Sequence, residues 1–162
     1  MVFWESITIL GDLEFWVGAG VIALILFFVV PKKYRKHVVW FVFLVLPAVM
    51  ISYGIGYILK IIFRIPRPCV GLATCPDGFS FPSGHATVIF AATSVLMFHY
   101  KDKKLGAFFL ILSVLVAVSR VMLGVHRVED IVAGSIIGMI TGVLVQKIYE
   151  NYQTKIERMI KS

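Results

Sequence analysis

Five long apolar segments, separated by short polar ones, dominate the pattern of hydrophobic and polar residues along the chain. A helix needs about 20 mostly apolar residues to cross the hydrocarbon core of a bilayer, and such long apolar runs are typical of membrane proteins. The pattern therefore predicts an all-α, polytopic membrane bundle of five transmembrane helices in a single domain, residues 1–162. The predicted helices cover residues 15–30, 38–59, 86–99, 105–118 and 128–149, of which the third and fourth are short.

Residues 1–11 precede the first span and carry apolar side chains at near-helical spacing among a few polar ones. Such a pattern is typical of a short helix that lies in the membrane interface, although a disordered terminus fits it equally well. The residues just before the first span are acidic, whereas a cleaved signal peptide has a basic region there. We therefore expect the first apolar segment to remain as a membrane helix.

The composition excludes a soluble globule, because 59% of the residues are hydrophobic and only 15% are charged. The net charge of +7 is compatible with a nucleic-acid partner, but the placement of the charges opposes one. Eleven of the 16 basic residues fall on one side of the five predicted spans. By the positive-inside rule this side is cytoplasmic, which predicts a multi-pass plasma-membrane protein with its N-terminus outside and its C-terminus inside. These residues are Lys32, Lys33, Arg35, Lys36, Lys101, Lys103, Lys104, Lys147, Lys155, Arg158 and Lys161.

Three polar clusters fall on the opposite, outward side of the predicted spans. One follows the second span, one opens the third, and one links the fourth to the fifth. Ionisable residues within such apolar surroundings cost free energy and therefore suggest a function. Taken singly, two of the clusters have ordinary explanations, namely interfacial snorkelling of basic side chains and an N-cap by a serine. Together they contain Lys60 and Arg67; Ser83, Gly84 and His85; and Arg120, His126 and Asp130.

The pooled chemistry of these clusters suits an anion with several oxygen atoms, and phosphate is the obvious candidate. Three cations and the free N–H groups of a helix start would hold the oxygens, whereas a metal site would need more carboxylates or cysteines. We therefore predict no metal and no cofactor. His126 lies four residues before Asp130, so one helix face would let Asp130 orient His126 as a nucleophile. His85 would protonate the leaving oxygen.

The same residues form a pattern that resembles the three-part signature of the type 2 phosphatidic acid phosphatase (PAP2) superfamily. The parts are Lys60 with six residues before Arg67-Pro68; Pro82-Ser83-Gly84-His85; and Ser119-Arg120 with five residues before His126 and three more before Asp130. The resemblance covers residues 60–142 and implies a metal-independent phosphatase that works through a phosphohistidine. Lys60, Arg67, Ser83, Gly84 and Arg120 would then bind the phosphate. Many membrane members of this superfamily resemble a six-span arrangement, whereas five spans are predicted here.

The resemblance implies a lipid phosphate substrate but leaves its class open. We expect a polyprenyl diphosphate, of the undecaprenyl type, hydrolysed to the monophosphate at the outer leaflet, because the outward loops are too short for a large headgroup pocket. Phosphatidic acid or phosphatidylglycerophosphate is the alternative. A lipid-phosphate binder without turnover would carry a broken motif, and all three parts are complete. The oligomeric state is left open.

Two further features bear on the predicted outward side. Cys69 and Cys75 are the two cysteines of the chain and lie in one outward loop, where either a disulfide or two reduced thiols are expected. Gly134, Gly138 and Gly142 form a stripe along the fifth span, and small residues at this spacing let membrane helices approach closely. The stripe predicts a close helix contact that would hold His126 rigidly.

Overall fold

The computed structural model describes residues 2–73 and 75–161, and the side chains of all of these except residues 2, 36 and 154–161. Met1 of the predicted interfacial segment lies outside the described residues. So do the side chains of Lys36, Lys155, Arg158 and Lys161, which contribute to the charge pattern.

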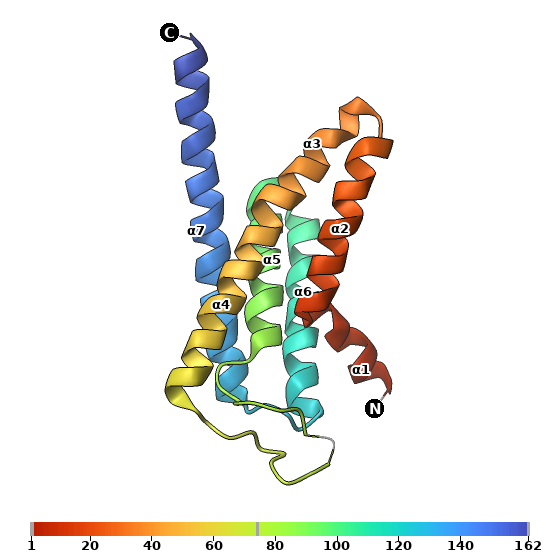
Figure 1. Ribbon diagram of the computed structural model, residues 1–162, viewed down its shortest axis with the longest axis vertical. Helices are drawn as coiled ribbons and strands as arrows, with labels where there is room; N and C mark the ends of the chain where they lie inside the picture. Colours follow the sequence, from red (N-terminus) through yellow and green to blue (C-terminus); the bar gives the residue numbers. More distant parts are fainter. Residues whose placement is uncertain (1, 74, 162) are drawn as a thin grey trace.

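Helices form the whole framework of the protein, and the part of the chain that the structure describes contains no strand (Figure 1). The all-α class predicted from the sequence is therefore confirmed. The elements are α1 (Val2–Thr8), the 3-10 turn η1 (Ile9–Gly11), α2 (Leu13–Val29), α3 (Lys32–Trp40), the π-helical η2 (Phe41–Val45), α4 (Leu46–Phe63), α5 (Gly84–Tyr100), α6 (Lys103–Met122) and α7 (Val128–Lys161).

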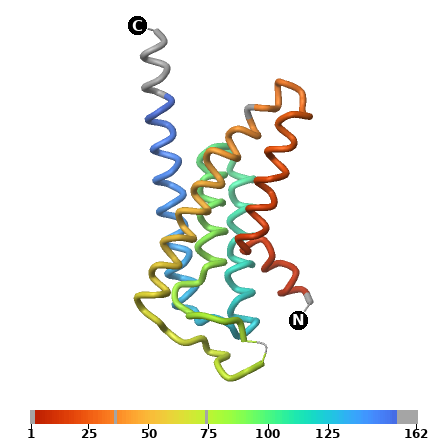
Figure 2. The backbone as a smooth tube through the Cα atoms, viewed as in Figure 1, coloured from red at the N-terminus to blue at the C-terminus, as the bar shows by residue number. Residues whose placement is uncertain are grey.

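The helices pass back and forth along one bundle, as the backbone trace shows (Figure 2). α2 runs away from the N-terminal end, and α3, η2 and α4 return as one continuous helix. α5 runs away again, α6 returns, and α7 ends at the C-terminus, beyond the other helices. The starts of α5 and α7, the end of α6 and the loop of residues 64–83 consequently share one end of the bundle, which we call the loop end.

The number of membrane spans differs from the prediction. Among the residues that the structure describes, three helical stretches are long and apolar enough to cross a membrane: Lys32–Phe63, Lys103–Met122 and Val128–Gln153. A fourth candidate is the pair Phe3–Gly11 and Leu13–Val29, whose two parts meet at 60°. Length and composition thus support three or four spans, and the predicted five are not confirmed.

Helix α5 explains part of this difference, because it lies in the middle of the bundle and contacts α4, α6 and α7. It is 17 residues long, at the lower limit for a span, and every residue from Ala86 to Val95 is buried. A helix enclosed by protein does not need the length or the uniform apolarity of one that faces lipid. The small and polar residues of α5 are those of an internal helix.

The predicted close helix contact along the glycine stripe of α7 is confirmed. A Cβ atom at Gly134 would lie 2.5 Å from the carbonyl oxygen of Ser83, and one at Gly142 would lie 2.5 Å from that of Ala91. Between them, a Cβ atom at Gly138 would overlap with the backbone of α5. Because all three contacts are with backbone atoms of α5 and the residue that precedes it, side-chain movement cannot relieve them. The stripe therefore fixes the distance between the two helices that begin at the loop end.

Pro47 lies in the first turn of α4, directly after the π-helical η2. Proline has no backbone N–H, so the carbonyl four residues earlier loses its partner and the preceding turn widens. The irregular turn follows from this single residue.

Candidate active site

The loop of residues 64–83 folds back over the end of α4. Arg64 adopts a left-handed conformation, with φ of 49°, and its N–H donates to the carbonyl of Lys60 at 2.9 Å. The returning part of the loop is held by Lys60, whose Nζ donates to the carbonyl oxygens of Phe79 at 2.7 Å and Ser80 at 3.1 Å. Lys60 thus positions the loop that covers the site.

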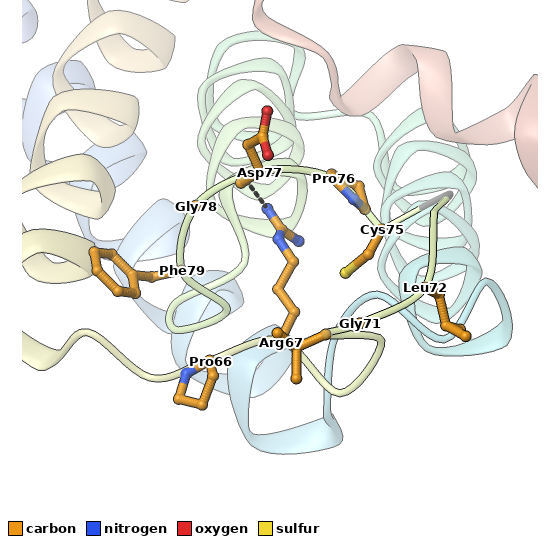
Figure 3. A pocket seen from close by; sticks show the side chains of 10 residues that line it. Pro66, Arg67, Gly71, Leu72, Cys75, Pro76, Asp77, Gly78 and Phe79 are labelled. Atoms are coloured by element: carbon orange, nitrogen blue, oxygen red, sulfur yellow. Dashed lines mark hydrogen bonds between the residues drawn. The ribbon is translucent and has the colours of Figure 1, made fainter.

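A cavity of about 450 Å³ opens within this loop, and the side chain of Arg67 extends across it (Figure 3). The Sγ atoms of Cys69 and Cys75 are bonded in a disulfide, with 5.4 Å between the Cα atoms, and Cys75 lines the cavity. Nη2 of Arg67 donates to the carbonyl of Asp77 at 3.4 Å, across the cavity. The disulfide closes the loop beside Arg67.

His126 lies against the other terminal nitrogen of the same Arg67 guanidinium. Nη1 of Arg67 is 3.1 Å from Nε2 of His126 and donates to the carbonyl of Val125 at 3.2 Å. Because a guanidinium can only donate, Nε2 must present its lone pair, which places the proton of the neutral ring on Nδ1. His126 is 4% exposed, and burial, with the nearby charges of Arg67 and Lys60, lowers its pKa below the ordinary value. The ring is therefore neutral at pH 7.

Asp130 faces the other ring nitrogen of His126. Its Oδ2 lies 3.4 Å from Nδ1 of His126 and accepts from the backbone N–H of Arg127 at 2.8 Å. The hydroxyl of Ser80 also donates to Oδ2 of Asp130 and lies 3.4 Å from Nδ1 of His126. Asp130 and Ser80 are both buried, so this network shields the His126–Asp130 pair from water.

Ser83 is the N-cap of α5, with its Oγ accepting from the N–H of Ala86 at 3.5 Å. Its own N–H donates to the carbonyl of Asp130 at 2.9 Å, which ties the starts of α5 and α7 together. The first N–H groups of a helix have no acceptor within the helix, and they point outward from this end. A Cβ atom at Gly84 would meet nothing within 4 Å, so there is open space beside this helix start.

Arg120 approaches the site from the end of α6 and is 8% exposed. Its Nη1 donates to Oγ1 of Thr8 at 2.8 Å, and its carbonyl accepts from the N–H of Val125 and of His126, at 3.2 Å each. Among the described residues, the buried Nε atoms of Arg120 and Arg67 have no hydrogen-bond partner. Two guanidinium groups therefore retain donors that an anion could occupy.

His85 follows at the second position of α5, and the N-terminal segment packs against it. Its Nε2 lies 2.7 Å from Oδ1 of Asp12, the residue between η1 and α2. A Cβ atom at Gly11 would lie 2.8 Å from Cβ of His85, so the backbone passes directly over the ring. The predicted N-terminal segment is thus helical in α1 and reaches the site through Thr8, Gly11 and Asp12.

All eight residues that the sequence predicts for the site lie at the loop end, on the helices α4, α5, α6 and α7 and on the loops that precede α5 and α7. They are Lys60, Arg67, Ser83, Gly84, His85, Arg120, His126 and Asp130. Three further residues, Ser80, Thr8 and Asp12, contact this set and were not predicted. The one sequence signal for Asp12 is an acidic residue directly before an apolar span. Within the described part of the chain, no group of three or more His, Cys, Asp or Glu residues could hold a metal ion.

Comparison with known families and sequences gives consistent matches. The model of the PAP2 superfamily matches residues 46–153. An undecaprenyl-diphosphatase of Sulfolobus acidocaldarius is 31% identical over 150 residues, which cover 91% of this chain and 71% of that protein.

Two solved structures share the fold. One is the crystal structure of the first transmembrane PAP2 type phosphatidylglycerolphosphate phosphatase from Bacillus subtilis, with a TM-score of 0.74 and 26% sequence identity over 92% of this chain and 76% of that chain. The other is the crystal structure of Aquifex aeolicus LpxE, with a TM-score of 0.71 and 26% identity over 90% of this chain and 84% of that chain.

Proposed function

The chain belongs to the PAP2 superfamily and is a membrane lipid phosphatase, and we propose that it removes the terminal phosphate of a polyprenyl diphosphate to leave the monophosphate. The observation that carries the chemistry is the state of His126, which is buried and neutral, with the lone pair of Nε2 toward Arg67 and Nδ1 toward Asp130. The substrate class rests on the likeness to the Sulfolobus undecaprenyl-diphosphatase, which extends over 91% of this chain.

In the first step, Nε2 of His126 attacks the terminal phosphorus and a phosphohistidine forms. The ring gains positive charge as the N–P bond forms, and the carboxylate of Asp130 beside Nδ1 stabilises that charge. Arg67 now contacts the lone pair of Nε2, so it must shift its hydrogen bond to a phosphate oxygen when the substrate binds. The nucleophile and its first phosphate ligand are therefore adjacent before the reaction.

The transferred phosphoryl group carries negative charge on its non-bridging oxygens. Lys60, Arg67 and Arg120 stabilise this charge, together with the hydroxyl of Ser83 and the N–H of Gly84. His85 protonates the leaving oxygen and then takes a proton from the water that hydrolyses the phosphohistidine. Every step uses side chains and backbone groups of this chain, so the proposed reaction is independent of metal ions.

We assign the loop end to the outer face of the membrane. The basic residues at the opposite end support this orientation through the positive-inside rule. The disulfide between Cys69 and Cys75 supports it independently, because such bonds persist in oxidising compartments. The N-terminus would then be outside and the C-terminus inside.

A phosphomonoester lipid is the second candidate substrate, and the likeness to the Bacillus subtilis phosphatidylglycerolphosphate phosphatase favours it. Phosphatidylglycerophosphate and phosphatidic acid both present a terminal phosphate on an alcohol oxygen. The same histidines would act on them, so the two candidates differ in the leaving group and not in the nucleophile.

The deciding experiment measures phosphate release by the purified protein from undecaprenyl diphosphate, phosphatidylglycerophosphate and phosphatidic acid, each with and without EDTA. We expect the highest kcat/KM for the diphosphate and no effect of EDTA. Equal or faster turnover of either monoester would overturn the substrate assignment, and loss of activity with EDTA would overturn the metal-independent mechanism.

A matched pair of variants tests the nucleophile. His126→Ala should release no phosphate, whereas His37→Ala, which changes an exposed histidine at the opposite end, should behave like wild type. Substrate labelled in the terminal phosphate should give an acid-labile, alkali-stable phosphoprotein in wild type and none in His126→Ala. Turnover by His126→Ala would contradict the proposal.

A further inference from the structure

The contact between His85 and Asp12 is a second His–Asp pair in the site. The first pair, His126 and Asp130, is local to the start of α7, whereas Asp12 reaches His85 from the junction of η1 and α2. The distance of 2.7 Å between Nε2 of His85 and Oδ1 of Asp12 is that of a charge-assisted hydrogen bond. The side chains of His85 and Asp12 are 21% and 34% exposed, so both remain open to the space at the loop end.

We propose that Asp12 is a positioning residue that orients His85 and stabilises its protonated form, the general acid of the reaction. This inference rests on the proposed function, because it concerns the step in which His85 protonates the leaving oxygen. It assigns to the N-terminal segment a part in the chemistry beyond a place in the membrane.

The charges around His85 explain why it needs this partner. The groups that act on it are Asp12 from the η1–α2 junction, Arg120 from α6 and Arg67 from the loop. Two arginines oppose a third positive charge on the imidazole ring, and an adjacent carboxylate compensates for it. Burial of the ring is the largest effect against its positive charge, and among the groups that act on it Asp12 is the one that favours the protonated form.

The hydrogen bond with Asp12 determines which ring nitrogen of His85 can donate a proton to the substrate. Because Oδ1 of Asp12 accepts from Nε2 of His85, the N–H at Nδ1 is the one that is available to the substrate. As the P–O bond breaks, the leaving oxygen takes its electron pair and receives the proton of Nδ1, which leaves His85 neutral. In the second step Nδ1 takes a proton from water while the new P–O bond forms, and the electron pair of the P–N bond returns to His126.

Two other contacts show that the N-terminal segment is built into the site. Thr8 accepts a hydrogen bond from the buried Arg120 at 2.8 Å, and Gly11 passes over the His85 ring, with space for no larger residue. A single short segment therefore holds both the general acid and a phosphate-binding arginine. Asp12 contacts His85, and Thr8 contacts Arg120.

The first test compares Asp12→Asn with Glu14→Gln, a matched change of an exposed carboxylate two residues further along the chain. Asp12→Asn should lower kcat for undecaprenyl diphosphate by about 10- to 100-fold with little change in KM, by analogy with the loss of partners that orient a metal-binding histidine. The alkaline limb of its pH profile should move to lower pH, because the imidazolium has lost its anion. Glu14→Gln should match wild type in both respects.

The conservative variant separates charge from shape. Asp12→Glu keeps the carboxylate, so its alkaline limb should stay at the wild-type position even where its kcat is reduced. An alkaline limb that is unchanged in Asp12→Asn would overturn the proposal. So would a higher kcat in Asp12→Asn, since this is the result expected if Asp12 instead occupied the place of the phosphate and inhibited the enzyme.

A readout without substrate keeps this inference separate from the proposed function. In nitrogen-15 histidine NMR spectra, with the His85 signal assigned by its loss in His85→Gln, the ring should titrate at lower pH in Asp12→Asn than in wild type. If wild type fails to hydrolyse the diphosphate, the proposed substrate fails, but the NMR titration still decides whether Asp12 stabilises the protonated ring of His85. Identical titrations in the two proteins would refute the pairing.

Discussion

Each end of the bundle carries two of the four histidines of the chain, and helix α5 contributes one to each end. His85 lies in its first turn and His99 in its last. The imidazole of His99 stacks on the ring of Trp40, with 3.8 Å between the ring centroids, and meets the ring of Tyr100 in a T-shaped arrangement, with 5.1 Å between the centroids. His99 therefore lies among aromatic rings, while His85 pairs with a carboxylate.

The histidines of the loop end differ from those of the opposite end in their partners. Asp12 and Asp130 lie beside the loop-end histidines, whereas within the described part of the chain no carboxylate forms an ion pair with His37 or His99. The comparison shows that the residue type alone carries no catalytic meaning in this chain. We propose a function for the histidines of the loop end, where a carboxylate lies beside one ring nitrogen and cations lie nearby.

The largest expected effect comes from the same substitution made at both ends. His126→Gln should lower kcat by about 10⁴-fold or more, because it removes the nucleophile. His99→Gln loses its contacts with the rings of Trp40 and Tyr100 and should leave kcat within a factor of about two, since His99 lies at the end of the bundle opposite the proposed site. Phosphate release by both purified variants, at matched protein concentration, measures the contrast. A comparable loss in His99→Gln would show that the two ends are coupled.

The second expected effect concerns the glycines that hold the loop end together. Gly138→Ala places a Cβ atom against the backbone of α5, and overpacking of this kind costs about 1–3 kcal/mol. Gly54→Ala is the control, because a Cβ atom there meets nothing within 4 Å. Thermal unfolding in detergent should therefore show a lower Tm for Gly138→Ala than for Gly54→Ala. Equal Tm values would mean that α5 and α7 can separate without cost.

The third prediction concerns Ser80, which bridges the His126–Asp130 pair. Ser80→Ala removes the hydroxyl that donates to Asp130, so the carboxylate loses a buried hydrogen bond and orients His126 less firmly. We expect kcat to fall about 10-fold, by analogy with the loss of groups that orient a ligand. Ser135→Ala, on α7 but bonded to the carbonyl of Ile131, is the matched control and should retain wild-type kcat. Full activity in Ser80→Ala would leave Ser80 with a structural role alone.

The candidate site could be located from the sequence because its parts lie at the ends of apolar segments. Helices that alternate in direction bring every second end together, so Lys60, His85 and His126 had to share one end. The spacing of His126 and Asp130 is local to one helix start and needs no knowledge of the fold. Local spacing and the alternation of helices were therefore sufficient for the eight predicted residues.

The contributions of Ser80, Thr8 and Asp12 depend on packing between distant segments, and the sequence pattern carries little sign of it. Thr8 and Arg120 are separated by 112 residues, and Ser80 and Asp130 by 50. The number of membrane spans could not be predicted from the apolar segments either, because an apolar helix can be enclosed by protein, as α5 is. Apolar length indicates that a helix avoids water, not whether lipid or protein surrounds it.

The smallest expected effect is a pH dependence of stability that originates at the loop end. Burial and the adjacent cations hold the pKa of His126 below the ordinary value of about 6.5, so the folded protein keeps this ring neutral while the unfolded chain binds a proton. The stability that depends on the neutral ring is therefore complete above about pH 6.5 and is lost as the pH falls below it. At pH 5.5 the loss should be about 1 kcal/mol relative to pH 7.5. Comparing Tm at these two pH values for wild type and His126→Gln measures it, because the variant lacks the titrating ring. If Tm falls by the same amount in wild type and in His126→Gln, groups other than His126 cause the loss of stability in acid. His126 would then not distinguish the loop end from the opposite end in its response to pH.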